Sequence, residues 1–222
     1  MSFIVKNTTF PSLLDLIVPH SCRGCRRIGN ILCDRCKNNI ILDHIDNPPQ
    51  LKLPKSFPPV FAISDRTGIV NSLIHDFKYN SARALAKPLA EILDQIIPSI
   101  PNPVTIIPLP TTNSHIRARG LDHTYLISKH LAKIRHYQMV NFLIRNNNSV
   151  QVGANRETRL RQAKTAYKAN PNIQIDPDIT YILFDDVWTT GASMQAAVKK
   201  LRQSGAKKII ICLLAISRLD QN

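Results

Sequence analysis

The sequence predicts an α/β protein in which helices cover both faces of a doubly wound, mostly parallel sheet. Short apolar runs alternate along the chain with amphipathic stretches, an order typical of parallel strands joined by crossover helices. Hydrophobic residues make up 44% of the 222 residues and only 7 are glycine, which favours a folded core over disorder. Two pairs of cysteines ahead of the first predicted strand add a small N-terminal module.

The cysteine pairs predict a structural zinc site. Two C-x-x-C pairs allow four thiolates to converge on one Zn²⁺, and here the ligands would be Cys22, Cys25, Cys33 and Cys36. Gly24 and Gly29 are expected to ease the two turns by adopting positive φ. A redox-active pair is the alternative, which the doubled pattern disfavours. A total of five cysteines, an odd number, argues against a disulfide framework. We expect a zinc module over residues 1–45, with a short helix at 10–17.

A proline-rich linker is predicted over residues 46–59, followed by the main domain over 60–222. The first half of that domain begins with an apolar run, continues with two segments whose apolar residues recur at helical spacing, and then reaches a second apolar run. The predicted elements are a strand at 60–63, helices at 65–79 and 82–97, and a strand at 105–110.

The middle of the domain is more polar. A loop at 111–120 carries Arg117 and Arg119, and a helix at 121–134 and a strand at 140–145 follow it. A basic loop after a strand can hold a phosphate group, although an ordinary surface loop is the simpler interpretation of Arg117. Residues 146–168 are basic and show almost no apolar periodicity. They are predicted to form a flap that closes over an anion or an arm that binds nucleic acid.

The stretch from Tyr181 to Ser193 carries the strongest functional signal. An apolar strand at 181–184 leads into Asp185 and Asp186, and a helix at 194–201 follows a loop whose residues are Thr189, Thr190, Gly191, Ala192 and Ser193. Unpaired N–H groups at a helix start attract phosphate. The two carboxylates suit ribose hydroxyls or a divalent cation instead. A sugar 5-phosphate satisfies both halves of the motif. The last strand is predicted at 208–215, with Cys212 in the core.

The net charge of +14, from 29 basic and 15 acidic residues, predicts an anionic partner, either nucleic acid or a polyphosphate. No apolar run approaches the ~20 residues of a membrane helix, and no secretory signal is recognisable. We therefore expect a cytoplasmic protein without membrane insertion.

The stretch through Ser193 resembles the phosphoribosyl pyrophosphate (PRPP) motif of type I phosphoribosyltransferases. Further segments extend the resemblance, over nearly the whole chain, to the ComF family of competence proteins, which fuse a zinc finger to a type I phosphoribosyltransferase-like domain. These segments are the two C-x-x-C pairs, Phe77-Lys78-Tyr79, Ile107–Pro110 leading to Arg119-Gly120, and Arg145 with Gln151. After Gly120 the family usually continues Phe-Asn-Gln, whereas this chain has Leu121-Asp122-His123, where a carboxylate would repel pyrophosphate unless Mg²⁺ bridges them.

The resemblance implies roles for particular residues. Asp185 and Asp186 would hold the ribose hydroxyls of PRPP, Thr189 to Ser193 its 5-phosphate, and Arg119 would lie near the pyrophosphate, with Mg²⁺ accompanying the ligand. It also implies a role in natural transformation, in which the protein handles incoming single-stranded DNA beside a helicase-like ATPase. The alternative is an active Mg²⁺-dependent phosphoribosyltransferase with an unidentified acceptor.

Overall fold

The computed structural model describes residues 20–80, 82–112, 116, 120, 122–146 and 166–217. The helix predicted at 10–17, both arginines of the 111–120 loop and most of the basic stretch at 146–168 lie outside the described residues.

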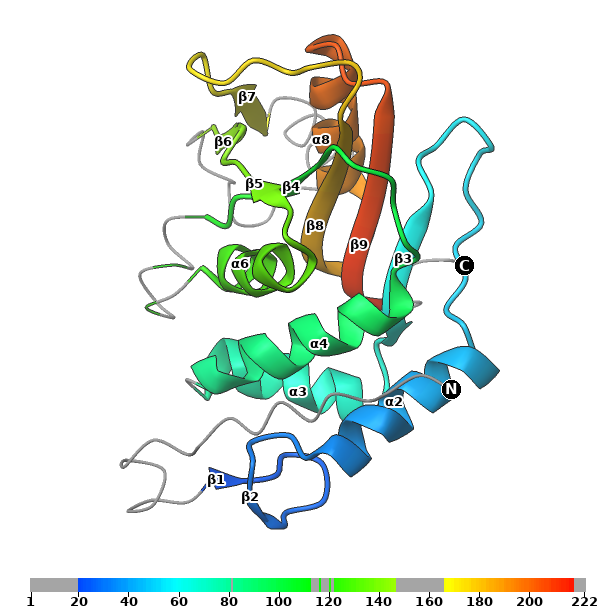
Figure 1. Cartoon of the computed structure of the whole chain (residues 1–222), viewed down its shortest axis with the longest axis vertical. Helices are drawn as coiled ribbons and strands as arrows, with labels where there is room; N and C mark the ends of the chain where they lie inside the picture. The colour runs from blue at the N-terminus through cyan, green and yellow to red at the C-terminus, as the bar shows by residue number, and fades with distance from the viewer. Residues whose placement is uncertain are drawn as a thin grey trace, which may run out of the picture.

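A five-stranded parallel sheet forms the centre of the molecule (Figure 1). Its strands, in spatial order, are β3 (Val60–Asp65), β9 (Lys208–Ile216), β8 (Thr180–Trp188), β4 (Val104–Pro108) and β5 (Gln138–Met139). Every neighbouring pair runs parallel. The predicted α/β class with a mostly parallel sheet is therefore confirmed.

Helices cover both faces of the sheet, as a doubly wound fold requires. Alternate residues of β8 enter two different apolar clusters: Ile182 and Phe184 join one, and Tyr181 and Leu183 join the other. The first cluster is completed by α3 (Gly68–Tyr79), the 3-10 turn η1 (Arg83–Leu85), α4 (Ala86–Ile96) and α6 (His123–Arg135). The second is completed by α8 (Ala192–Gln203) and the apolar side chains of the 51–57 segment.

β8 is longer than the sequence predicted, because it continues to Trp188 instead of ending at Phe184. Its pairing with β4 ends at Phe184 opposite Pro108, whereas its pairing with β9 continues to Trp188 opposite Ile216. The two aspartates interrupt the apolar pattern, but β9 still offers backbone partners on one side. Asp185 and Asp186 consequently lie within a strand, just past the end of β4.

Only residues 143–145 of the strand predicted at 140–145 form a strand, and that strand lies outside the five-stranded sheet. β5 precedes that range, and Val140 makes the last backbone hydrogen bond to β4, from its N–H to the carbonyl oxygen of Ile106. Phe142 and Leu143 then turn into the cluster beneath α8. β6 (Leu143–Arg145) pairs antiparallel with β7 (Tyr167–Ala169), so the end of the predicted basic stretch is a short strand.

The N-terminal segment contains a hairpin, β1 (His20–Ser21) with β2 (Ile28–Gly29), and the helix α2 (Asp34–Asp46). α2 was not predicted from the sequence, because only Cys36 and Ile40 are buried along it, too few to produce an apolar period. Figure 1 shows α2 lying beside α4, and the hairpin beyond the start of α2.

α2 joins the N-terminal segment to the main core. Lys37 pairs with Glu91 of α4 at 2.7 Å, and the ring of His44 donates to the carbonyl oxygen of Ile63 at 2.9 Å. α2 also extends into the range predicted as linker. The division into module, linker and main domain stays a prediction. Across the ranges given above, no helix has both the length and the apolar character to cross a membrane.

Candidate functional site

The two aspartates of β8 lie at the carboxyl edge of the sheet, where ligands of open parallel sheets bind. They stand past the last residue of β4 in register, and both are partly accessible to solvent. The Oδ1 atom of Asp185 accepts a hydrogen bond of 2.8 Å from the N–H of Asp186, which fixes the orientation of the first carboxylate. The acid pair is therefore a defined part of this edge.

Lys78, at the end of α3, is the cation of the acid pair. Its Nζ lies 2.5 Å from Oδ2 of Asp186, and the two side chains are only 14% and 19% exposed. Because little water screens this pair, the Coulomb attraction between its two charges is stronger than in an exposed ion pair. Lys78 thus serves as an internal counter-ion, and a cation or sugar hydroxyl that binds Asp186 must share that carboxylate with it.

Asp185 holds its proton more strongly than an ordinary carboxyl group does. Burial, followed by the negative charge of Asp186, raises the pKa of Asp185 to about 7, and the N–H of Asp186 together with Lys78 and Arg145 offsets part of the rise. Near neutral pH the carboxyl group of Asp185 therefore gains and loses its proton, next to the ion pair between Asp186 and Lys78. Such a pair can both donate hydrogen bonds to sugar oxygens and accept them from hydroxyls.

Arg145 of β6 and Tyr167 of β7 form a second wall beside Asp185. They are opposite each other in the β6–β7 register, and the guanidinium carbon lies 5.8 Å from the centre of the tyrosine ring. Burial and then the charge of Asp185 raise the pKa of Tyr167, whereas Arg145 and a hydrogen bond with Ser193 lower it. The short sheet thereby reaches both the acid pair and the 189–193 loop.

The 189–193 loop predicted from the sequence includes the start of α8, because the helix begins at Ala192, two residues earlier than predicted. Gly191 is the N-cap, with φ of 73°, a conformation that side-chain-bearing residues rarely adopt. The N–H of Ala192 donates to Oγ1 of Thr190 at 3.4 Å, and both threonines are exposed. α8 has no acidic residue in its first turn, so the positive end of its dipole is not neutralised there. The start of α8 can therefore attract an anion.

Gly191 is also required because Trp188 packs against it. A Cβ atom at position 191 would lie 2.6 Å from Cε2 of the indole, which is far inside van der Waals contact. Trp188 itself is buried and meets Phe57 edge to face, with ring centroids 5.9 Å apart. This contact agrees with the interpretation of Trp188 as a packing residue. Its indole packs against the 189–193 loop at Gly191.

Asp122 and His123 form hydrogen bonds that fix the segments around the site. The carboxylate of Asp122 caps α6 by accepting from the N–H of Tyr125 at 3.2 Å, and it also accepts from the hydroxyl groups of Thr111 and Thr124. Nε2 of the buried His123 donates to the carbonyl oxygen of Phe77 at 2.8 Å. This second bond ties the start of α6 to the residue that precedes Lys78. Asp122 and His123 therefore have structural roles.

The four paired cysteines form the second candidate site. Their sulfur atoms all lie within 4.8 Å of one another, and the Sγ atoms of Cys25 and Cys33 are 3.7 Å apart. A tetrahedral Zn²⁺ with bonds of about 2.3 Å separates its sulfurs by about 3.8 Å. The four thiol groups are therefore close enough to bind one zinc ion. In that arrangement the metal would tie the β1–β2 hairpin to the start of α2 and take no part in chemistry.

The protonation of the cysteines fits a site that needs a cation. Burial opposes ionisation of Cys22, but the N–H groups of Cys25, Cys33 and Gly24 outweigh it and lower the pKa to about 6. Burial and the neighbouring thiols raise the pKa of Cys36 to about 12. Four thiolates cannot be close together without a metal ion to offset their charge.

Only one of the two knuckle glycines has the positive φ that was expected. Gly29 has φ of 131°, whereas the other left-handed residue of the knuckle is Arg26, with φ of 61°. Gly24 is needed for space, because a Cβ atom there would come within 2.7 Å of both Cys36 Sγ and Ile69 Cδ1. Cys212, the fifth cysteine, is fully buried in the core as predicted.

Comparisons with known proteins add little to this geometry. No protein-family model matches the chain, and no curated protein matches it either. Among the solved structures that match is that of the allosteric regulatory enzyme of purine biosynthesis, with 15% identity and a TM-score of 0.42. The match covers 63% of this chain and 30% of that chain. At this level, the likeness assigns no residue and no activity to the protein.

Proposed function

We propose that the protein binds a ribose 5-phosphate of the PRPP type at the carboxyl edge of its sheet. The 5-phosphate would accept hydrogen bonds from the backbone N–H groups at the start of α8 and from the hydroxyls of Thr189, Thr190 and Ser193. The ribose hydroxyls would bind Asp185 and Asp186, and Mg²⁺ would accompany the pyrophosphate, with Arg119 nearby. The observation that carries the proposal is an acid pair and an anion loop on consecutive parts of one strand and helix.

Binding can be measured without a label, because Trp188 is the single tryptophan and lies directly beneath the loop. Titration with ribose 5-phosphate should change its emission and saturate. Asp186→Asn should weaken binding about tenfold or more, the effect of losing a hydrogen bond to a charged group. Asp178→Asn is the matched control, because Asp178 is an exposed acid ahead of β8, at the opposite edge of the sheet. Equal affinities in the wild type and Asp186→Asn would refute the site.

We further propose, following the resemblance to ComF proteins, that the protein acts in the cytoplasm during DNA uptake and binds single-stranded DNA there, beside a helicase-like ATPase. Arg23, Arg26 and Arg27 are exposed on the cysteine hairpin, and Arg35 follows at the start of α2. Arg23 also contacts Asp76 of α3 at 3.5 Å. On that helix the ring of Tyr79, 61% exposed, lies 5.1 Å from that of His75. Guanidinium groups beside an exposed aromatic pair suit a strand of phosphates and bases.

This second role has a separate test. Affinity for an oligothymidylate should fall as salt rises, with a slope of about 0.7 for each phosphate neutralised. Arg26→Gln combined with Arg27→Gln should reduce that slope by about one to two, whereas Lys207→Gln, at an exposed lysine ahead of β9, should leave it unchanged. Affinity independent of salt would contradict the proposal. Pyrophosphate release that requires Mg²⁺ and an added acceptor would instead establish the alternative, a phosphoribosyltransferase.

A further inference from the structure

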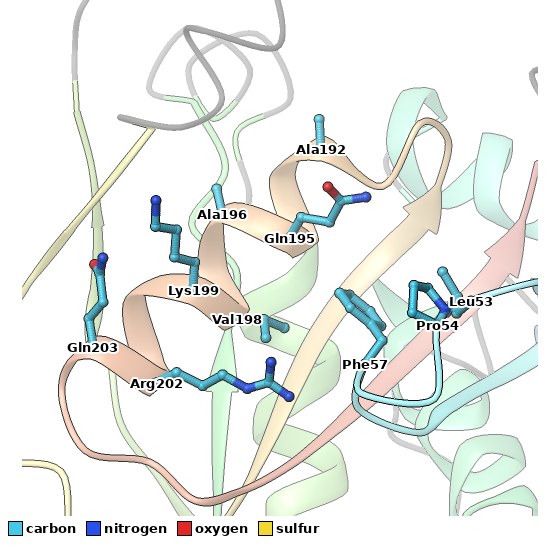
Figure 2. A pocket seen from close by; sticks show the side chains of 10 residues that line it. All are labelled: Leu53, Pro54, Phe57, Ala192, Gln195, Ala196, Val198, Lys199, Arg202 and Gln203. Carbon is cyan, nitrogen blue, oxygen red and sulfur yellow. The ribbon is translucent and has the colours of Figure 1, made fainter.

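A cavity of about 570 Å³ lies between α8 and the segment that leads into the main domain (Figure 2). Leu53, Pro54 and Phe57 form one wall, and Ala196 and Val198 of α8 form the other. This volume lies within the range of small-molecule sites. The cavity is separate from the acid pair, because neither aspartate lines it.

The charges around this cavity have one sign. Among the residues that the structure describes, Lys199 and Arg202 line it and no acidic residue does, and α8 carries no acid along its length. The guanidinium group of Arg202 reaches toward the opposite wall, where Nη2 donates to the carbonyl oxygen of Ser56 at 2.7 Å. Lys199 is exposed and forms no ion pair with the residues that the structure describes. An apolar interior with cations on its rim selects a ligand that is apolar and carries negative charge.

The cavity also touches the loop of the proposed phosphate site. Ala192, the first residue of α8, lines it. Phe57 packs edge to face on Trp188, and the indole lies against Gly191. A molecule that fills the cavity therefore contacts Ala192 of the loop directly, and it contacts Phe57, whose ring packs on the indole next to Gly191.

We propose that this cavity is a binding site for a small organic anion that has a flat apolar body and one acidic group. The body would occupy the space between Phe57 and Ala196, and the acid would face Lys199 and Arg202. Occupation changes the affinity of the 189–193 loop for phosphate through Phe57 and Trp188. This coupling rests on the proposed function, whereas the existence of the site does not.

The probe for the site is 1-anilinonaphthalene-8-sulfonate, an aromatic body with one sulfonate whose emission rises in apolar surroundings. The wild type should bind one equivalent saturably. Ala196→Phe, which fills the cavity, should abolish the rise, and Lys199→Gln should weaken binding about fivefold, as for one exposed charge. Lys207→Gln, an exposed lysine outside the cavity, is the control. Melting curves establish that each variant is folded. If Ala196→Phe does not fold, the probe affinity of Lys199→Gln alone tests whether the site exists.

The results separate the site from its coupling. No saturable binding, or equal binding in Lys199→Gln and the wild type, overturns the site. Strictly competitive displacement by inorganic phosphate, in which the apparent dissociation constant of the probe rises without a plateau as phosphate is added, overturns it too, because the sulfonate would then occupy the loop. Saturating probe should change the dissociation constant of ribose 5-phosphate, and the sugar phosphate should change that of the probe by the same factor. An unchanged constant refutes the coupling. If ribose 5-phosphate never binds while the probe does, the proposed function fails and the site stands.

Discussion

Replacing Gly191 by alanine tests the packing that supports the 189–193 loop. The residue has φ of 73°, and its missing Cβ would overlap the indole of Trp188. Alanine in the left-handed conformation costs about 1–2 kcal/mol. Displacing a packed side chain adds about 1–3 kcal/mol. Gly191→Ala should therefore reduce the free energy of unfolding by about 2–5 kcal/mol.

Gly68→Ala is the matched control for this substitution. Gly68 starts α3 with φ of 54°, but a Cβ there would have no heavy atom within 4 Å. Gly68→Ala should therefore reduce the free energy of unfolding only by the cost of the left-handed conformation, about 1–2 kcal/mol. Urea unfolding measures both variants, and the emission of the single tryptophan reports where the indole lies. We expect a shifted native-state emission in Gly191→Ala and an unchanged one in Gly68→Ala.

Two results would refute this reasoning. Equal losses of stability in the two variants would mean that the indole does not oppose a side chain at position 191. A native emission spectrum in Gly191→Ala identical to that of the wild type would mean that Trp188 does not contact the loop. Either result would also remove the route through Phe57 and Trp188 by which the cavity is coupled to the loop.

Further predictions concern the acid pair and the cysteines. Because folding raises the pKa of Asp185 from 3.8 to about 7, its ionisation disfavours the folded state. In urea unfolding, the stability of the wild type relative to Asp185→Asn should fall by at most about 4 kcal/mol between pH 4 and pH 7 and stay constant above pH 7. A stability difference that does not depend on pH would contradict the raised pKa. Lys78→Met should increase the affinity for Mg²⁺ about tenfold in calorimetry, because it removes the ammonium group 2.5 Å from Asp186. Weaker Mg²⁺ binding in the variant would contradict the role of Lys78 as the counter-ion of Asp186. Cys33→Ser should remove zinc from the purified protein and lower its melting temperature, whereas Cys212→Ala, at the buried cysteine outside the cluster, should keep its zinc. A Cys33→Ser protein with full zinc content would refute the metal site.

The sequence predicted most of the sheet because fully buried strands are continuous apolar runs. β3, β4, β8 and β9 were all located from such runs. The end of β8 was misplaced because two aspartates break its apolar pattern, although the backbone of β9 continues beside them. α2 was missed for a related reason: two buried residues one turn apart produce no visible period.

The candidate site was predicted in its local parts and missed in its distant ones. The acid pair and the 189–193 loop are neighbours in sequence, so one motif reveals both. Lys78 and Arg145 lie in segments that the family resemblance singled out, but nothing in their spacing shows that they face Asp185 and Asp186. Tyr167 gave no signal at all, because its position depends on the antiparallel pairing of β6 with β7. Such contacts between distant segments need a structure.

The same limit applies to the cavity next to α8. Its two walls come from the proline-rich segment and from a helix near the other end of the chain. The segment was predicted to be a linker, and its composition supports that interpretation. Only the packing of Phe57 on Trp188 shows that part of the linker covers the helix that follows the anion loop.

Comparing ribose 5-phosphate with 2-deoxyribose 5-phosphate tests the central claim, that one site holds the phosphate on the loop and the hydroxyls on the aspartates. Both sugars are titrated into the wild type and into Asp186→Asn, with Trp188 emission as the signal. We predict that the wild type binds ribose 5-phosphate about tenfold more tightly than the deoxy sugar, the effect of one hydrogen bond to a charged group. In Asp186→Asn this preference should largely disappear. Equal affinities in the wild type, or a preference that survives the substitution, would contradict the account.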